Sequence, residues 1–169
     1  VANLSSHKKG WDDRWREFSE WAVKGKEIQN RLLSLVDEDT EAYNKIIAAR
    51  RMPKNTVEEI NKRNDAIQDA FKEAILVPLR VMETSFSGFE LIRNMVEKGN
   101  PSSVSDAAVG SLALIAAING AFLNVRINSS GVEDKEFISS VLLKGNEIVS
   151  KSRTEGEYIQ KVVDSCIRL

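Results

Sequence analysis

The chain has 169 residues, of which 42% are hydrophobic and 29% charged, and its formal net charge is −1. This is ordinary globular composition, which argues against extended disorder, and the length fits one domain with a single substantial core. The balanced charge removes the long-range attraction expected of a generic nucleic-acid binder, and the single cysteine, Cys166, excludes an internal disulfide.

The pattern of apolar residues predicts an all-α chain, a single-domain bundle of long helices over residues 1–169. β-branched and aromatic residues never alternate convincingly with polar ones at period two, as strands would require. We expect a first long helix from about Asp12 to Ala49. Four aromatic residues anchor its start: Trp11, Trp15, Phe18 and Trp21.

Near the end of this first helix, one carboxylate interrupts an apolar stripe. Steps of four and three along the helix define the stripe as Ile28, Leu32, Leu35, Asp39, Ala42 and Ile46. An inward Asp39 requires an explanation, because desolvating an ionised carboxylate is costly unless it is paired. It is either a general acid/base or a structural contact to a buried hydroxyl, amide or helix terminus. The neighbouring carboxylates are expected to point largely to solvent.

A second long helix is predicted after the connector Arg50–Asn55. Thr56 followed three residues later by Glu59 makes a capping box, which marks the start of the helix. Apolar spacing continues through Pro78, so we expect one helix kinked there and stopped by Gly99–Pro101.

The third predicted helix is the most apolar part of the chain. It runs from Asp106 to about Asn128, with Ser105 or a near neighbour as its cap. The stretch Ala107–Val125 approaches the ~20 residues that span a bilayer. It is interrupted by Asn119 and Asn124, rich in alanine and glycine, and free of interfacial aromatics. We therefore interpret it as a central helix surrounded by the others, and expect no membrane association.

A last helical region is predicted from Glu133 to the C-terminus. Its apolar residues, Cys166 among them, lie along one face. Gly145 or Gly156 is expected to bend it.

A second group of candidate site residues borders the central helix. Asn124 and Asn128 lie four apart on one face, where they can present amide donors and acceptors to a ligand, and Asp106 lies in the first turn. Alternatively, Asp106 caps the helix and the asparagines close its end. Lys54 in the connector is a candidate for binding an anionic substrate tail, although this signal is weak. His7 has no partner histidine, and we expect no metal, no cofactor and no phosphate-binding loop.

Several stretches resemble the formimidoyltetrahydrofolate cyclodeaminase family, which also includes methenyltetrahydrofolate cyclohydrolases. In the family's order they are Leu35–Tyr43, Met52–Thr56, Gly99–Asp106 and Gly120–Asn128. The last stretch is the most specific, and the resemblance spans nearly the whole chain. The family usually begins with a Pro-Gly-Gly-Gly-Ser-like loop and a small-residue helix. Neither has a match here, so the start of the chain resembles the part of the family that comes after that helix.

The resemblance implies a catalytic role for Asp39, the same residue that the apolar stripe singles out. The implied enzyme is an ammonia-lyase of histidine degradation. It converts 5-formimidoyltetrahydrofolate to 5,10-methenyltetrahydrofolate and ammonia with Asp39 as general acid/base, while Lys54, Asp106, Asn124 and Asn128 bind the substrate. The cyclohydrolase reaction is the alternative. We favour the cyclodeaminase because Met52–Thr56 looks closest to the cyclodeaminase part of bifunctional enzymes.

The resemblance also implies partners. These are a folate substrate, with or without a polyglutamate tail, a second copy of the chain in a homodimer, and a formimidoyltransferase as a further candidate. A cytoplasmic location is the simplest expectation. A hypothesis of another class is a non-catalytic helical module that holds a partner or builds an oligomer, with Asp39 as a structural polar contact.

Overall fold

The computed structural model describes residues 1–6, 9 and 12–167, and every regular element among them is helical. The elements in chain order are α1 (Ala2–Ser6), the 3-10 turn η1 (Asp12–Arg14), α2 (Trp15–Arg50), α3 (Val57–Lys98), the 3-10 turn η2 (Pro101–Ser103), α4 (Val104–Ser129) and α5 (Lys135–Cys166). The predicted all-α bundle is confirmed. Trp11 and His7 lie outside the described residues.

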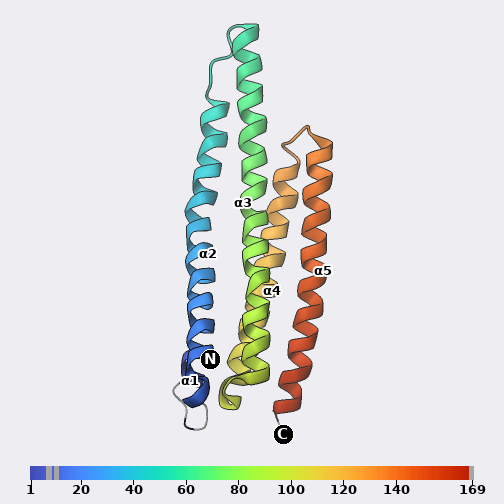
Figure 1. Ribbon diagram of the computed structural model, residues 1–169. Helices are drawn as coiled ribbons and strands as arrows, with labels where there is room; N and C mark the ends of the chain where they lie inside the picture. Colours follow the sequence, from blue (N-terminus) through green and yellow to red (C-terminus); the bar gives the residue numbers. More distant parts are fainter. Residues whose placement is uncertain (7–8, 10–11, 168–169) are drawn as a thin grey trace.

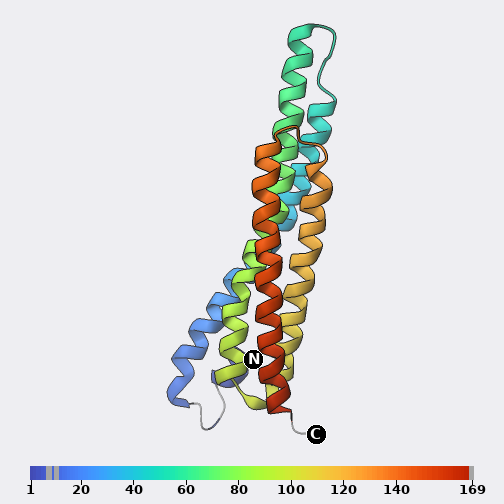
Figure 2. The same cartoon turned by 90° about the vertical axis from the view of Figure 1, so that its right-hand side faces the viewer.

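The four long helices do not share one length or one position along the bundle. The α2–α3 hairpin extends well past the connection between α4 and α5 (Figure 1). Toward its N-terminal end, α2 leans away from α4 and α5 (Figure 2). One side of α4 is therefore left without a helical neighbour along much of its length.

Helix α3 confirms the prediction of one continuous helix through Pro78. At its start the Thr56 hydroxyl accepts a hydrogen bond from the Glu59 amide at 3.2 Å, and the Glu59 carboxylate accepts one from the Thr56 amide at 3.3 Å. This reciprocal pair is the predicted capping box, and it fixes the first turn of α3.

The boundaries of α4 and α5 differ in detail from the predictions. Helix α4 begins at Val104, so Ser105 lies inside it, and the near neighbour Ser103 occupies the N-cap position without a capping hydrogen bond from its side chain. Asp134 caps α5, and its carboxylate accepts a hydrogen bond from the Phe137 amide at 3.0 Å. Cys166 is exposed and does not belong to the core.

The glycines of α5 serve close packing. The helix is assigned as continuous through both of them. An added Cβ at Gly145 would collide with the Phe122 ring, and one at Gly156 would lie 2.5 Å from Cδ1 of Ile115. Both contacts are with α4, so these glycines let the two helices approach closely.

The buried side chains form two clusters. The larger one joins α3, α4 and α5, together with Phe18 of α2, and includes Ile75, Met82, Ile118 and Ile159, each no more than 1% exposed. The smaller one joins α2 to α3 alone. Its members are Leu35, Ala42, Ile46, Ala70, Ala74 and Val77.

One side of α4 is apolar but exposed in the single chain. Ile118 and Val125 are fully buried, whereas the large apolar side chains of the opposite side are 59–70% exposed. We call this side the open face of α4. It consists of Val109, Leu112, Ala113, Ala116, Gly120, Leu123 and Ile127.

The open face corrects the expectation that neighbours surround the central helix on every side. By length and composition alone, Pro101–Ser129 passes the criterion for a membrane span, and 22% of its most apolar window is buried. A core helix of a bundle passes the same criterion. Within the described residues, this side of α4 is left uncovered.

Candidate active site

Asp39 lies in a groove between α2 and α4 whose floor is α3. The groove has a volume of ≈ 480 Å³. Its lining residues are Leu32, Leu35, Val36, Asp39 and Thr40 of α2, Pro78 and Val81 of α3, and Ala117, Ala121 and Asn124 of α4. We call it the Asp39 groove. Most of its wall is apolar, and the Thr40 hydroxyl donates to the Val36 carbonyl oxygen at 3.2 Å, which leaves Asp39 and Asn124 as its main polar groups.

The structure confirms the stripe that contains Asp39 but corrects its burial. Leu35 and Ala42, one turn to either side, are 1% and 2% exposed because α3 covers them, whereas Asp39 itself is exposed. At Asp39 the helix surface meets the groove instead of the α2–α3 core. Within the part of the chain that the structure describes, the Asp39 carboxylate has no hydrogen bond or ion pair. The described residues therefore offer no partner for a structural polar contact of Asp39.

The other carboxylates of the acidic run behave differently from Asp39. Asp37 and Glu41 are exposed, as predicted, but Glu38 is half-buried and forms an ion pair with Arg31. The hydrogen bond from the Arg31 guanidinium lowers the pKa of Glu38 below its ordinary value. Of the four carboxylates in this run, only Asp39 lines the groove.

The two asparagines of α4 have separate surroundings. Asn124 is exposed and lines the Asp39 groove from the side of α4. Asn128, one turn further on, uses its side-chain Nδ2 to donate to the carbonyl oxygen of Ala74 in α3 at 2.8 Å. The structure thus brings Asn124 together with Asp39, and ties Asn128 to the backbone of α3.

Lys54 and Asp106 lie away from the groove in the single chain. Lys54 is exposed in the connector at the tip of the α2–α3 hairpin. Asp106 is exposed in the first turn of α4, roughly 27 Å from Asn124 at ~1.5 Å per helical residue. One chain therefore does not bring Lys54 and Asp106 together with the groove residues that are predicted to bind the substrate.

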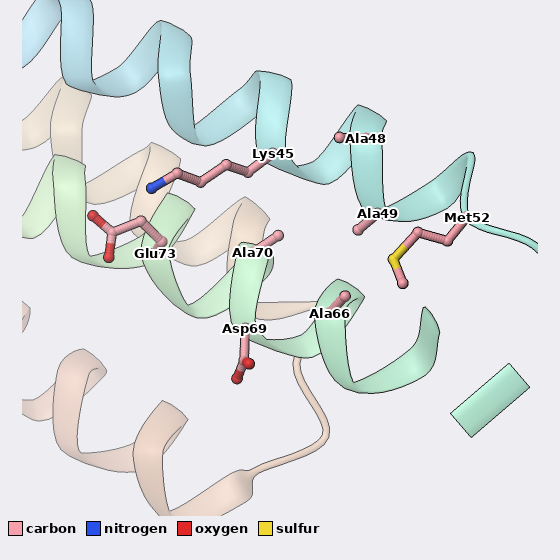
Figure 3. Close-up of a pocket in the computed structure, with 8 residues that line it drawn as sticks. All are labelled: Lys45, Ala48, Ala49, Met52, Ala66, Asp69, Ala70 and Glu73. Atoms are coloured by element: carbon pink, nitrogen blue, oxygen red, sulfur yellow. The ribbon is translucent and has the colours of Figure 1, made fainter. Parts of the chain in front are cut away.

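A second hollow lies between α2 and α3 near the hairpin tip, and the sequence alone did not indicate it. Its volume is ≈ 560 Å³, and it is lined by Lys45, Ala48, Ala49, Met52, Ala66, Asp69, Ala70 and Glu73. Figure 3 shows Lys45 reaching across toward Glu73 at one end and Met52 at the other. In the sequence, the four alanines were the available signal for this hollow. Small residues on facing helices normally allow close packing, so they gave no reason to expect a hollow.

Of the three charged residues that line this second hollow, Glu73 is engaged, whereas Lys45 and Asp69 have no hydrogen bond or ion pair among the described residues. Glu73 accepts a hydrogen bond from Nη2 of Arg80 at 2.6 Å. We take the Asp39 groove as the candidate site for acid/base chemistry because α2, α3 and α4 all line it and Asn124 lines it opposite Asp39, although it is the smaller of the two.

The composition of the Asp39 groove limits what it can bind. Apolar walls with a few polar groups suit a small organic ligand that carries some hydrogen-bonding atoms. Asp39 is the one titratable side chain among the lining residues. Among the residues that the structure describes, no cluster of three or more His, Cys, Asp or Glu is placed to hold a metal ion.

Comparison with solved structures supports the fold. A formiminotetrahydrofolate cyclodeaminase from Thermotoga maritima superposes with a TM-score of 0.83 at 24% identity, covering 98% of this chain and 78% of that one. At this identity the likeness establishes the architecture only.

Sequence comparison identifies relatives at higher identity. A methenyltetrahydrofolate cyclohydrolase of Methylorubrum extorquens is 30% identical over 165 residues, which are 98% of this chain and 79% of that protein. The formimidoyltransferase-cyclodeaminase of Rattus norvegicus is 31% identical over 129 residues, or 76% of this chain and 24% of that protein. This chain thus spans about a quarter of the bifunctional relative. The family model described as formiminotransferase-cyclodeaminase matches residues 1–147, and the chain belongs to this family.

Proposed function

We propose that this chain is an enzyme acting on a one-carbon derivative of tetrahydrofolate, and that its reaction is the cyclodeaminase one. The substrate would be 5-formimidoyltetrahydrofolate, and the products 5,10-methenyltetrahydrofolate and ammonia. The observation that carries the proposal is the position of Asp39, a carboxylate without a partner among the described residues that opens into an apolar groove opposite Asn124. The names of the relatives support the substrate class.

The proposed chemistry needs one group that carries a proton between two nitrogens. N10 of the folate attacks the carbon of the protonated formimidoyl group, and a tetrahedral centre forms with bonds to N5, N10 and the amino nitrogen. The Asp39 carboxylate takes the proton from N10 and returns it to the amino nitrogen. That C–N bond then breaks, ammonia leaves, and the positive charge spreads over N5, carbon and N10. Acid/base help of this kind accelerates reactions by ~10² to 10⁴.

The remaining residues of the groove would hold the substrate. The apolar walls, which include Leu35 and Ala121, would pack against the ring system of the folate. The Asn124 amide would form hydrogen bonds with the polar edge of that ring system. Lys54 and Asp106 lie too far from the groove to contact the same pterin within one chain. Their predicted contact with the substrate requires either a long glutamate tail or a second copy of the chain.

We also propose that the chain works as a homodimer joined through the open face of α4. Val109, Leu112, Leu123 and Ile127 form an exposed apolar stripe, and the alanines and glycine between them let a partner helix approach closely. Exposed apolar patches rimmed by polar residues are typical of protein interfaces. The Asp39 groove borders this face, so a partner there would shield the bound folate from water. A formimidoyltransferase, fused or separate, would supply the substrate.

The second candidate is the methenyltetrahydrofolate cyclohydrolase reaction. It is favoured by the M. extorquens relative of that name, which matches 98% of this chain. Water adds to the methenyl carbon, and Asp39 takes one proton from that water and delivers it to N5 as the bond from carbon to N5 breaks. The remaining hydroxyl proton is lost to solvent, which leaves the formyl group of 10-formyltetrahydrofolate on N10. The groove would hold either substrate in the same orientation.

Two assays on the purified chain separate these reactions. With 5-formimidoyltetrahydrofolate, a cyclodeaminase releases ammonia while the near-ultraviolet absorbance of the methenyl bridge rises. With 5,10-methenyltetrahydrofolate, a cyclohydrolase removes that absorbance faster than spontaneous hydrolysis does. We expect the first activity to dominate, and dominance of the second would assign the cyclohydrolase reaction. Turnover of neither substrate would leave the non-catalytic helical module.

A further inference from the structure

Pro78 leaves a backbone acceptor of α3 without its usual donor. In a regular helix the amide of residue 78 would donate to the carbonyl of Ala74, but proline has no N–H. The proline ring also crowds that carbonyl and turns it outward from the helix axis. Ala74 is only 5% exposed, so water does not readily take the place of the missing donor, and a buried unsatisfied carbonyl is costly.

A side chain of the neighbouring helix supplies the donor. Nδ2 of Asn128 in α4 lies 2.8 Å from the Ala74 carbonyl oxygen, in a half-buried position. One hydrogen bond therefore connects α4 to α3 at the turn that the proline interrupts. Pro78 itself is part of the floor of the Asp39 groove, and Asn124, one turn before Asn128, is part of its wall.

We propose that Asn128 is a positioning residue that replaces the amide missing at Pro78, and thereby fixes the floor of the Asp39 groove relative to its walls. The effect on turnover rests on the proposed function, but the effect on folding does not. This role differs from the pterin contact predicted for Asn128 from sequence, because one N–H of its side-chain amide is donated to the Ala74 carbonyl oxygen. Asn124 keeps the predicted contact.

A double-mutant cycle between Asn128 and Pro78 tests the proposal. Asn128→Leu keeps most of the side-chain volume but removes the donor, and Pro78→Ala returns a backbone N–H to the Ala74 carbonyl. With Pro78 present, we expect Asn128→Leu to raise the unfolding equilibrium constant roughly 5- to 100-fold in urea titrations. In the Pro78→Ala background the same change should have an effect of about twofold or less, because the restored amide now satisfies the carbonyl. Equal effects in both backgrounds would overturn the proposal.

Asn124→Leu is the matched control for this cycle. It is the same chemical change one turn away, at a residue with no hydrogen bond to α3 in the described part of the chain, so its effect on unfolding should be independent of residue 78. If Asn128→Leu alone does not fold, the double variant decides. If the double variant folds, the restored amide of residue 78 has replaced the Asn128 donor, as the proposal requires. If neither the single nor the double variant folds, the proposal is contradicted.

Kinetics supply the readout that a purely structural role would not change. With Pro78 present, Asn128→Leu should raise KM for the folate about tenfold or more, because the groove floor shifts, while kcat changes less because Asp39 is carried by α2. In the Pro78→Ala background, Asn128→Leu should not raise KM. A direct contact with the pterin predicts the same rise in both backgrounds. If the wild-type chain turns over no folate, the proposed function fails while the unfolding cycle still decides the role of Asn128.

Discussion

The two sides of α4 are similar in composition but differ in what they contact. The packed side buries Ile118 and Val125 against α3 and α5, and the open face leaves Leu112 and Leu123 about 60% exposed. Hydrophobicity alone therefore does not decide which side of this helix a single chain covers. The packed side is expected to govern folding stability, whereas the open face and the adjoining Asp39 groove are expected to govern turnover and association.

The largest effect should follow from a change in the groove. Asp39→Asn removes the proton carrier but keeps the shape of the side chain, so kcat should fall by ~10² to 10⁴. Because Asp39 is exposed in the chain, the free energy of unfolding should change by no more than about 0.5 kcal/mol. Steady-state turnover and urea unfolding of the same preparation measure the two quantities.

Asp37→Asn is the matched control for Asp39. It removes an exposed carboxylate two residues earlier on α2, outside the groove, and should change kcat less than twofold. Normal turnover by Asp39→Asn would refute the catalytic role. A loss of about 1 to 3 kcal/mol in stability without a loss of turnover would instead point to a polar contact made in the assembled oligomer.

A charge on the open face should produce the next largest effect. Leu123→Glu places a carboxylate in the proposed dimer interface, where an unpaired charge is costly to bury, so we expect dimer dissociation to become at least about 100-fold easier. Leu123 is 60% exposed in the single chain, so the fold itself should persist. Sedimentation equilibrium measures the mass, and circular dichroism checks the helix content.

Val57→Glu is the control for this substitution. Val57 is 75% exposed at the first turn of α3, far from α4, and the same change there should leave the mass unaltered. A wild-type chain that stays monomeric at all concentrations would rule out the proposed use of the open face.

The packed side should respond through stability alone. In Gly145→Ala the new Cβ collides with the Phe122 ring, and overpacking of this kind costs about 1 to 3 kcal/mol. At Gly110 of α4 an added Cβ would lie 3.4 Å from Ile92, an ordinary contact, so Gly110→Ala should be neutral or stabilising by up to ~1 kcal/mol. Thermal unfolding compares the pair, and equal effects would mean that α4 and α5 are not closely packed at Gly145.

The sequence was sufficient for the elements of the fold because their signals are local. The capping box at Thr56, the stop after Lys98 and the apolar spacing through Pro78 all depend on residues a few positions apart. The exposure of Asp39 was not predictable in this way. It depends on where α4 lies relative to α2, and the spacing along α2 shows only that Asp39 shares a face with Leu35 and Ala42.

The sequence was also insufficient for the roles of the α4 residues. Asn124 and Asn128 share a face and a residue type, so their spacing gave them the same predicted role. What separates them is a long-range contact with the Ala74 carbonyl. The missing N–H of Pro78 was visible in the sequence, but the helix that supplies a replacement donor was not. Likewise, an all-round apolar α4 predicts burial without saying whether a neighbouring helix or a second chain provides it.

The smallest predicted effect is the pH dependence of the cap of α5. The hydrogen bond from Lys72, followed by the one from the Phe137 amide, lowers the pKa of Asp134 below its ordinary value of 3.8. A carboxylate whose pKa is lower in the folded chain stabilises the fold above that ordinary value, and this contribution is lost as the pH falls through the folded pKa. Asp134→Asn should therefore lower the urea midpoint slightly near neutral pH, and the gap to wild type should close as the pH drops below about 4.

Two comparisons make the Asp134 prediction specific to the packed side of the molecule. Glu133→Gln removes an exposed carboxylate next to Asp134 that forms no ion pair among the described residues, so its gap to wild type should vary less with pH. Turnover and mass of Asp134→Asn should match wild type, because α5 lines neither the Asp39 groove nor the open face of α4. A gap that stays constant from neutral pH to pH 3 would show that the carboxylate of Asp134 does not stabilise the fold through its charge.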